Sequence, residues 1–176
     1  MEQVRDNLVF SLECWPEVGQ ECDFAIPPNV MAEALDLGEE GGEAPRLLTS
    51  VRGRMRMQLV SWKLKITGFF ACKAEMVCDR CLTSFAGRLD DKFEETVRLY
   101  EPGSEDESQM TPEALETAVP VVNQKFDLTP LLGEFFLLAL PYKTLCQPDC
   151  AGLCPECGAN LNEAPCECRG SKPTKH

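Results

Sequence analysis

The pattern of apolar and polar positions between residues 50 and 100 predicts three long consecutive strands. In "SVRGRMRMQLV" (50–60) the apolar side chains fall on odd positions, and in "WKLKITGFFACKAEMVC" (62–78) most of them fall on even positions. A period of two returns between residues 85 and 99, after the "CDRC" turn. Alternation of this length is typical of amphipathic strands. We therefore expect an antiparallel hairpin joined near Val60–Ser61 that continues into a meander.

Shorter patterns predict one more strand and a helix in the N-terminal part of the chain. Apolar and polar residues alternate in "NLVFSLEC" (7–14), as in a strand. "PPNVMAEALDL" (27–37) suits a short helix that begins near Pro28 and Asn29.

The segment "DLTPLLGEFFLLALP" (127–141) predicts a second helix. Its apolar residues recur at helical spacing, at positions 128, 131, 132, 135, 136 and 139. Thr129 before Pro130 suits an N-cap followed by proline at the first helical position, and Pro141 suits the end of the helix.

The order of these elements predicts an α+β fold, in which an antiparallel β meander packs against a helix and ends in a cysteine-rich, zinc-ribbon-like C-terminal tail. We expect a core domain over residues 1–145, a zinc-binding tail over 146–168 and a disordered terminus over 169–176. Two acidic segments, about 38–45 and 101–120, are expected to be flexible loops, the second with one turn of helix.

Cysteine usage narrows the chemistry. The chain has 11 cysteines, and those of the tail are closely spaced. No apolar run reaches the roughly 18 residues that would span a membrane, and the N-terminus does not resemble a signal peptide. We therefore expect a cytoplasmic protein. The reducing environment of the cytoplasm disfavours disulfides and favours metal ligation by cysteine.

Eight of the cysteines form four closely spaced pairs, enough for one or two structural zinc sites. The pairs are Cys78/Cys81, Cys146/Cys150, Cys154/Cys157 and Cys166/Cys168. The glycine after Cys157 is typical of a zinc knuckle.

The spacing leaves two arrangements of these pairs open. In the first, Cys154/Cys157 join Cys166/Cys168, and Cys78/Cys81 join Cys146/Cys150. In the second, the consecutive cysteines of the tail form one local site. That site would comprise Cys146, Cys150, Cys154 and Cys157.

Other roles for the cysteines are less consistent with the sequence. A redox pair at Cys78/Cys81 would open a helix, whereas here it falls between two strands. The only histidine is His176, so neither a histidine-containing catalytic zinc site nor a Ser-His-Asp set is available. We expect no enzyme activity. Isolated cysteines are expected to act as small buried hydrophobes, namely Cys14, Cys22 and Cys72.

The formal net charge of −12 conceals a basic segment. Residues 46–73 carry seven basic and no acidic side chains, which leaves −19 on the rest of the chain. Alternation puts five of the basic residues on the polar face of the predicted hairpin, where they could contact a phosphate backbone, an acidic protein surface or only solvent. These five are Arg52, Arg54, Arg56, Lys63 and Lys65.

Three motifs together carry a family resemblance: "CDRCLTSF" (78–85), "FDLTPLLGEFFLLALP" (126–141) and "LCQPDCAGLCPECGANLN" (145–162). In this order they resemble the bacterial and plastid YceD family, the large ribosomal RNA subunit accumulation proteins. The resemblance implies a non-enzymatic cytosolic factor that supports accumulation or processing of large-subunit ribosomal RNA. It supplies no catalytic residue.

We therefore expect a ribosome-biogenesis factor that contacts large-subunit ribosomal RNA or a pre-ribosomal particle through its basic hairpin. Two alternatives stay open. One is a protein–protein adaptor whose acidic surface binds a basic ribosomal protein. The other is a thiol- or zinc-responsive regulator.

Overall fold

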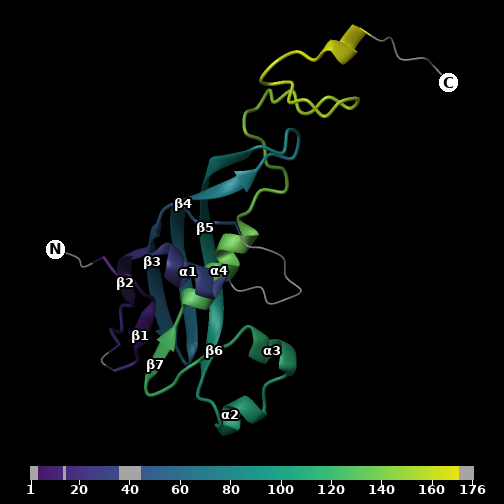
Figure 1. The fold of residues 1–176 in the computed structure, drawn as a ribbon. Coiled ribbons are helices and arrows are strands. Elements are labelled where there is room, and N and C mark those ends of the chain that lie inside the picture. Colours follow the sequence, from purple (N-terminus) through teal and green to yellow (C-terminus); the bar gives the residue numbers. More distant parts are fainter. Residues whose placement is uncertain (1–3, 14, 36–44, 171–176) are drawn as a thin grey trace.

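A five-stranded sheet forms the centre of the molecule (Figure 1). The structure is a computed structural model, and it describes residues 4–13, 15–35 and 45–170. The strands lie in the order β2–β3–β4–β5–β6; the first four are antiparallel, and β6 is parallel to β5. Their bounds are Gln20–Ile26, Val51–Val60, Lys63–Val77, Ser84–Tyr100 and Val119–Pro120.

The predicted meander is confirmed in β3, β4 and β5, which alternate between buried and exposed side chains along most of their length. The β3–β4 turn consists of Ser61 and Trp62, which both have positive φ angles, 50° and 63°. Such a two-residue turn matches the twist of the flanking strands. β4 and β5 run on beyond β3, so that their connecting turn projects from the sheet toward the C-terminal tail (Figure 1).

The N-terminal strands differ from the prediction. Within the described residues 7–13 of the expected strand, only Val9–Ser11 is β structure (β1), and it pairs with β7, Lys125–Asp127, in a separate two-stranded sheet. β2 was not predicted, although Cys22, Phe24 and Ile26 alternate along it and are buried. Because β2 pairs with β3, it adds a strand beside the basic hairpin.

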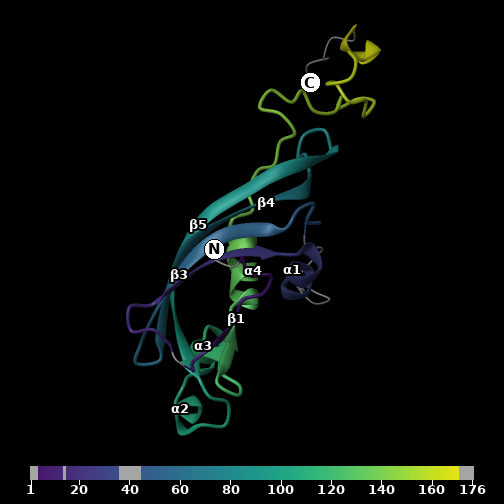
Figure 2. The same ribbon diagram turned by 90° about the vertical axis from the view of Figure 1, so that its left-hand side faces the viewer.

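Two helices cover one face of the sheet (Figure 2). They are α1, Pro28–Ala34, and α4, Thr129–Leu138, and both lie where the sequence predicts helices. Gly133 allows them to approach closely, because a Cβ atom there would lie 2.9 Å from the carbonyl oxygen of Ala34.

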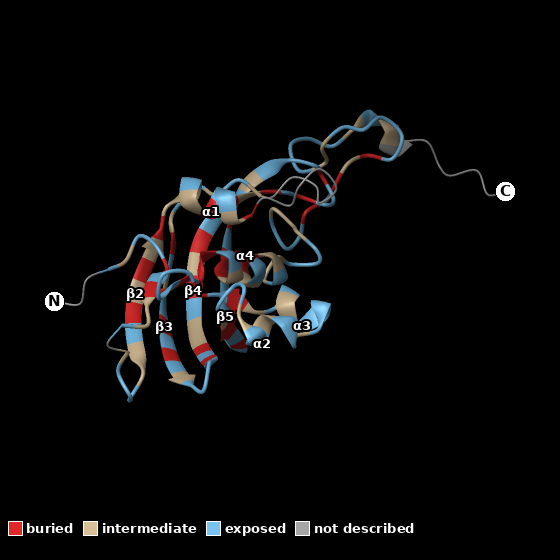
Figure 3. Cartoon of the chain, turned by 90° about the horizontal axis from the view of Figure 1, so that it is seen from below, coloured by how far each residue is buried: buried red, intermediate tan, exposed pale blue. Residues whose placement is uncertain are grey.

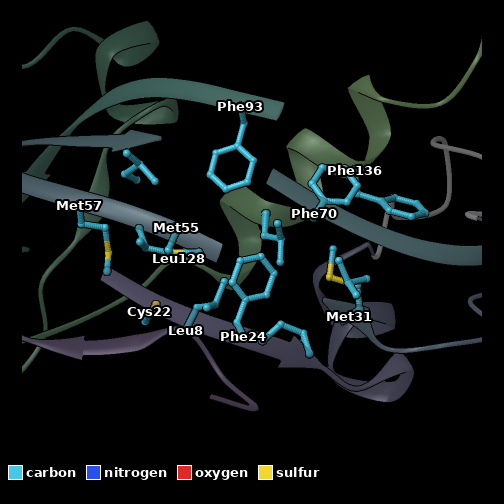
Figure 4. Packing of buried hydrophobic residues seen from close by; sticks show 14 of the residues in the cluster. Leu8, Cys22, Phe24, Met31, Met55, Met57, Phe70, Phe93, Leu128 and Phe136 are labelled. Atoms are coloured by element: carbon cyan, nitrogen blue, oxygen red, sulfur yellow. The ribbon is translucent and has the colours of Figure 1, made fainter. Parts of the chain in front are cut away.

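Aromatic side chains join α4 to the sheet (Figure 4). The ring of Phe136 lies 6.5 Å from that of Phe70, and the ring of Phe135 stacks at 4.7 Å on that of Phe93. Burying a side chain of this size stabilises the fold by about 1.5–3 kcal/mol. The opposite sheet face carries no such helical layer within the described ranges (Figure 2).

The start of α4 corrects one prediction. Thr129 lies inside the helix and is not its N-cap. Its backbone N–H and its hydroxyl both donate to Oδ1 of Asp127, at 2.8 and 2.6 Å. A carboxylate near the first turn also suits the positive end of the helix dipole. Pro141 follows the helix, whose C-cap is Ala139.

The acidic segment 101–120 contains two short helices, α2 (Glu105–Ser108) and α3 (Pro112–Glu116), where one helical turn was expected. Each begins at a hydroxyl side chain that caps it, Ser104 and Thr111 respectively.

Burial is concentrated in the sheet and α4, whereas most of the tail is exposed (Figure 3). The described part of the chain ends in a short 3-10 helix, Glu167–Gly170. Most of the predicted loop 38–45, residues 171–176 and Cys14 lie outside the described residues.

None of the helices in the described part of the chain is long and apolar enough to cross a lipid bilayer.

Candidate metal centres and the open sheet face

The first candidate metal centre joins the sheet to the tail. Cys78 and Cys81 lie in the turn between β4 and β5, and the tail brings Cys146 and Cys150 beside them. The four sulfur atoms lie within 4.8 Å of one another. Three of these cysteines are buried, and Phe85, Leu145 and Leu153 pack around the group.

The second candidate metal centre lies wholly within the tail. It consists of Cys154, Cys157, Cys166 and Cys168, whose sulfur atoms are also within 4.8 Å of one another. Only Cys154 is buried, and Cys157 is exposed. The structure thus brings the pairs together as in the first arrangement considered above. The local arrangement is not formed, because Cys150 and Cys154 belong to different groups.

The spacing of the sulfur atoms suits a tetrahedral metal ion. In the first group, Sγ of Cys78 and Sγ of Cys150 are 3.7 Å apart, and Sγ of Cys81 and Sγ of Cys146 are 3.6 Å apart. Tetrahedral zinc with bonds of about 2.3 Å places its sulfur ligands about 3.8 Å apart, whereas a disulfide bond is about 2.05 Å long. Each group could hold a metal ion.

Both C-x-x-C motifs adopt the same turn. At the first, the Leu82 N–H donates to the Cys78 carbonyl (2.9 Å), and the Cys78 N–H donates to the Thr83 carbonyl (3.1 Å). At the second, the Gly158 N–H donates to the Cys154 carbonyl at 2.9 Å, and the Cys154 N–H donates back across the turn at 2.8 Å.

The residue after the second cysteine has a left-handed backbone in both turns, with φ of 56° at Leu82 and 72° at Gly158. Glycine adopts this conformation without strain, whereas leucine is strained in it. The glycine of the second motif was recognised in the sequence as a knuckle signal. The first motif has the same geometry without that signal, so its likeness to a zinc knuckle was missed.

Backbone N–H groups favour the thiolate at the first cysteine of each motif. Burial acts to raise the pKa of Cys78, but hydrogen bonds from the backbone N–H groups of Cys146, Cys81 and Arg80 lower it to about 6. Backbone N–H groups of Cys157 and Glu156 lower the pKa of Cys154 to about 7. A thiolate is the form of cysteine that binds metal.

The thiols of Cys146 and Cys168 oppose this charge. Burial, followed by hydrogen bonding with neighbouring cysteines, raises the pKa of Cys146 to about 12. A hydrogen bond with Cys157, followed by burial, raises the pKa of Cys168 to about 11. Four thiolates this close together need a cation, so metal binding would release protons from these cysteines.

Hydrogen bonds that do not involve the sulfur atoms also fix the tail to the β4–β5 turn. Arg80 donates from Nη1 to the Cys150 carbonyl (2.9 Å), and its own carbonyl accepts from the Leu153 N–H (3.1 Å). Asp79 exchanges two hydrogen bonds with Thr144, at 2.8 and 2.6 Å.

Asn162 supports the first centre from within the tail. Its Nδ2 donates to Sγ of Cys150 (3.3 Å), and its Oδ1 accepts from the Ala151 N–H (2.8 Å). Groups that orient ligands in this way help to determine metal affinity.

The predicted basic residues all lie exposed on the open face of the sheet, but the face is not free of acids. Register places Arg54 opposite Asp23 of β2, and the two form an ion pair at 2.6 Å. Arg56 pairs with Glu21 of the same strand, and Lys65 pairs with Glu94 of β5 at 2.7 Å. Glu21 and Asp23 were missed because β2 was not predicted. Glu94 was missed because the charges of the predicted third strand were not counted with those of the hairpin.

The open face keeps a positive excess despite these ion pairs. The alternation of β2 to β5 puts nine basic and five acidic side chains on it. The basic residues are Arg52, Arg54, Arg56, Lys63, Lys65, Lys73, Arg88, Lys92 and Arg98; the acidic residues are Glu21, Asp23, Glu75, Asp90 and Glu94.

Phe69 is an apolar side chain on this charged face, and it was not predicted there. It is 51% exposed, and it lies opposite Arg54 on one neighbouring strand and Lys92 on the other. The strand period could have revealed it, because consecutive Phe69 and Phe70 must point to opposite faces. Phe70 is the one in the core.

The isolated cysteines outside the two groups follow the prediction where the structure describes them. Cys22 and Cys72 are both buried among core residues, and burial raises the pKa of Cys72 to about 11. Cys14 lies outside the described residues.

Comparison with known proteins gives the family. The family model described as "Large ribosomal RNA subunit accumulation protein YceD" matches residues 66–175, which include most of β4, all of β5 and α4, and both cysteine groups. No solved structure matches.

Curated relatives match over part of their length. Uncharacterized proteins of Mycobacterium tuberculosis and Mycobacterium bovis are each 32% identical over 111 residues, which cover 63% of this chain and 51% of theirs. A Zea mays protein named "Large ribosomal RNA subunit accumulation protein YCED homolog 1, chloroplastic" is 29% identical over 171 residues, with 81% of this chain and 58% of that protein covered. The chain spans about half the length of the curated relatives it matches. From the family match over residues 66–175, the chain belongs to the YceD family.

Proposed function

We propose that this chain is a non-enzymatic ribosome-biogenesis factor that supports accumulation or processing of large-subunit ribosomal RNA. In this proposal it binds that RNA, free or within a pre-ribosomal particle, through the open face of the sheet. The family description and the name of the maize relative support the ribosomal role.

The observation that carries the proposal is the exposed ring of Phe69 among cations on the open face. RNA-binding sheets commonly combine basic side chains, which contact phosphates, with aromatic rings, on which unpaired bases stack. Contact with solvent alone would explain the charged side chains of this face, but it would not explain a half-exposed phenylalanine among them. Unpaired bases of an RNA loop or single strand therefore fit this face better than a regular duplex.

The ion pairs distinguish the cations of this face by how much each is expected to contribute to phosphate binding. Arg54, Arg56 and Lys65 are held by carboxylates, so a phosphate would have to compete for them. Of the five basic residues predicted from the sequence, Arg52 and Lys63 have no ion pair among the described residues, and both are exposed. We therefore assign the main phosphate contacts to Arg52 and Lys63.

We propose zinc as the metal of both cysteine groups. Four thiolates suit a zinc site that is structural, with every coordination position filled by protein. Zinc at the first group would tie the tail to the β4–β5 turn, and zinc at the second would stabilise the tail itself. Neither role requires the metal to take part in a reaction.

RNA binding by defined variants tests the sheet-face proposal. The probe is a labelled, transcribed large-subunit ribosomal RNA precursor, titrated with the full chain at several salt concentrations. We expect Phe69→Ala to weaken binding about tenfold, because stacking on an aromatic ring is worth about 1–3 kcal/mol per base. Arg52→Gln with Lys63→Gln should lower the slope of log affinity against log salt by about 1.5.

The matched control removes two exposed positive charges elsewhere, in Lys125→Gln with Lys143→Gln. It should leave both affinity and slope close to those of the unaltered chain. Equal losses in the control and the sheet-face variants would refute a specific face. Unchanged RNA binding in Phe69→Ala would contradict the proposal that RNA bases stack on this ring.

A further inference from the structure

A groove lies on the helix-covered side of the molecule, between the edge of the sheet and α4. β5, α3, β6 and α4 contribute its walls, and these elements can be followed in Figure 1. Its volume is about 370 Å³. It is separate from both cysteine groups and from the open sheet face, since none of their residues lines it apart from Thr96.

The floor of the groove is apolar. Val97 and Val119 are buried beneath it, and Phe135 is half-buried at its side, with its ring stacked on Phe93. Leu138 belongs to its lining and is 82% exposed. An exposed leucine beside a hollow with buried valines can gain apolar contact only if something enters the groove.

The rim of the groove is acidic. Its lining includes Glu95, Glu116, Asp127 and Glu134 and no lysine or arginine. All four carboxylate residues are exposed, and none of them forms an ion pair among the described residues. Glu95 faces the helix side of the sheet, because it lies opposite Ile66, which is buried.

We propose that this groove binds a basic, amphipathic polypeptide segment of a partner protein, with an apolar side chain in the groove and lysine or arginine side chains on its rim. Four carboxylates that form no ion pair in the described part of the chain would attract positive charge and repel phosphate. By its charge, this surface therefore differs from the RNA face. The apolar floor favours a segment with large aliphatic or aromatic side chains over a free cation or polyamine. The proposal does not depend on RNA binding at the open face.

Fluorescence anisotropy with the full chain tests the groove. The probe is a short labelled amphipathic peptide of leucine and lysine, and a second peptide of lysine and serine with the same charge is compared with it. The leucine-containing peptide should bind more tightly. Leu138→Ala should weaken its binding about threefold and leave that of the serine-containing peptide unchanged.

The charge variants use isosteric amides. Glu95→Gln with Glu134→Gln should weaken binding of the leucine-containing peptide about fivefold, which corresponds to about 0.5 kcal/mol for each exposed ion pair. Asp127 is left intact because it accepts hydrogen bonds from Thr129 at the start of α4. The matched control, Glu17→Gln with Glu33→Gln, removes two exposed carboxylates elsewhere and should have little effect.

Three results would overturn the proposal. Equal weakening by the groove and control pairs would mean that the peptide responds only to overall charge. Loss of ribosomal RNA binding in the groove variants would identify RNA as the occupant. Self-association of the unaltered chain in sedimentation, abolished by Leu138→Ala, would identify a second copy of the chain.

Discussion

The two cysteine groups use the same turn in different settings. The first draws its ligands from the β4–β5 turn and from the tail, which are more than 60 residues apart in sequence, and three of its four cysteines are buried. The second lies within the short segment between Cys154 and Cys168, and only one of its cysteines is buried. Each contains a C-x-x-C motif with two matching hydrogen bonds.

This difference separates a long-range link from a local one. A metal ion at the first group closes a long loop and fixes the position of the tail relative to the sheet, so its loss would loosen both the β4–β5 turn and the tail. A metal ion at the second group orders only the residues that surround it. The first group therefore determines where the second is held, whereas the reverse is not required.

The largest expected effect comes from removing one buried ligand. Cys150→Ser should abolish metal binding at the first group and release the tail from the β4–β5 turn, because structural zinc contributes on the order of 10 kcal/mol to folding of small zinc domains. Hydrogen exchange should then accelerate at the Leu153 and Asp79 N–H groups, which donate across this contact. The N–H groups of β3 should stay protected.

Cys157→Ser is the matched control for that experiment. It removes a ligand of the exposed group, and exchange should accelerate only between residues 154 and 168. If protection of the Leu153 and Asp79 N–H groups falls as far in Cys157→Ser as in Cys150→Ser, the two cysteine groups act as one unit.

An intermediate effect is expected at Asn162, which touches the first group only. Asn162→Ala removes the hydrogen bonds to Sγ of Cys150 and to the Ala151 N–H. Metal affinity of the first group should fall about tenfold, as for other groups that orient ligands. Competition with a chromogenic chelator would measure this. Equal release from both groups would contradict the assignment of Asn162 to the first.

The smallest effect concerns the left-handed residue of each turn. Gly158→Leu should destabilise the second group by about 1 kcal/mol, because leucine is strained at positive φ. Leu82→Gly relieves the same strain at the first group, and the extra freedom of glycine in the unfolded chain offsets the gain. Thermal unfolding of the metal-bound chain should therefore show a loss for Gly158→Leu alone. A large loss in Leu82→Gly would indicate that the leucine side chain is needed.

The sequence predicted what depends on local periodicity. Strands β3, β4 and β5 are long, and their alternation is strong enough to decide their exposed faces. The strand at Gln20–Ile26 was missed although its buried residues alternate; it directly precedes a proline-rich helix start. Glu21 and Asp23 of this strand were therefore missed as well, and they form ion pairs with two of the predicted RNA-binding arginines.

The candidate sites were only partly predictable for the same reason. All eight cysteines could be chosen from their spacing, but pairing Cys78 with Cys150 requires the tail to return to the β4–β5 turn, which no local pattern encodes. The groove was not predicted at all, because its carboxylates come from separate elements of the fold. Residues that meet only through tertiary structure leave no periodic signal.

Metal stoichiometry measured by native mass spectrometry tests the central claim most directly. The account predicts two zinc ions in the unaltered chain, one in Cys78→Ser, one in Cys157→Ser and none in the double variant. A single ion that is lost in Cys157→Ser and retained in Cys78→Ser would contradict it. That result would restore the local site of Cys146, Cys150, Cys154 and Cys157.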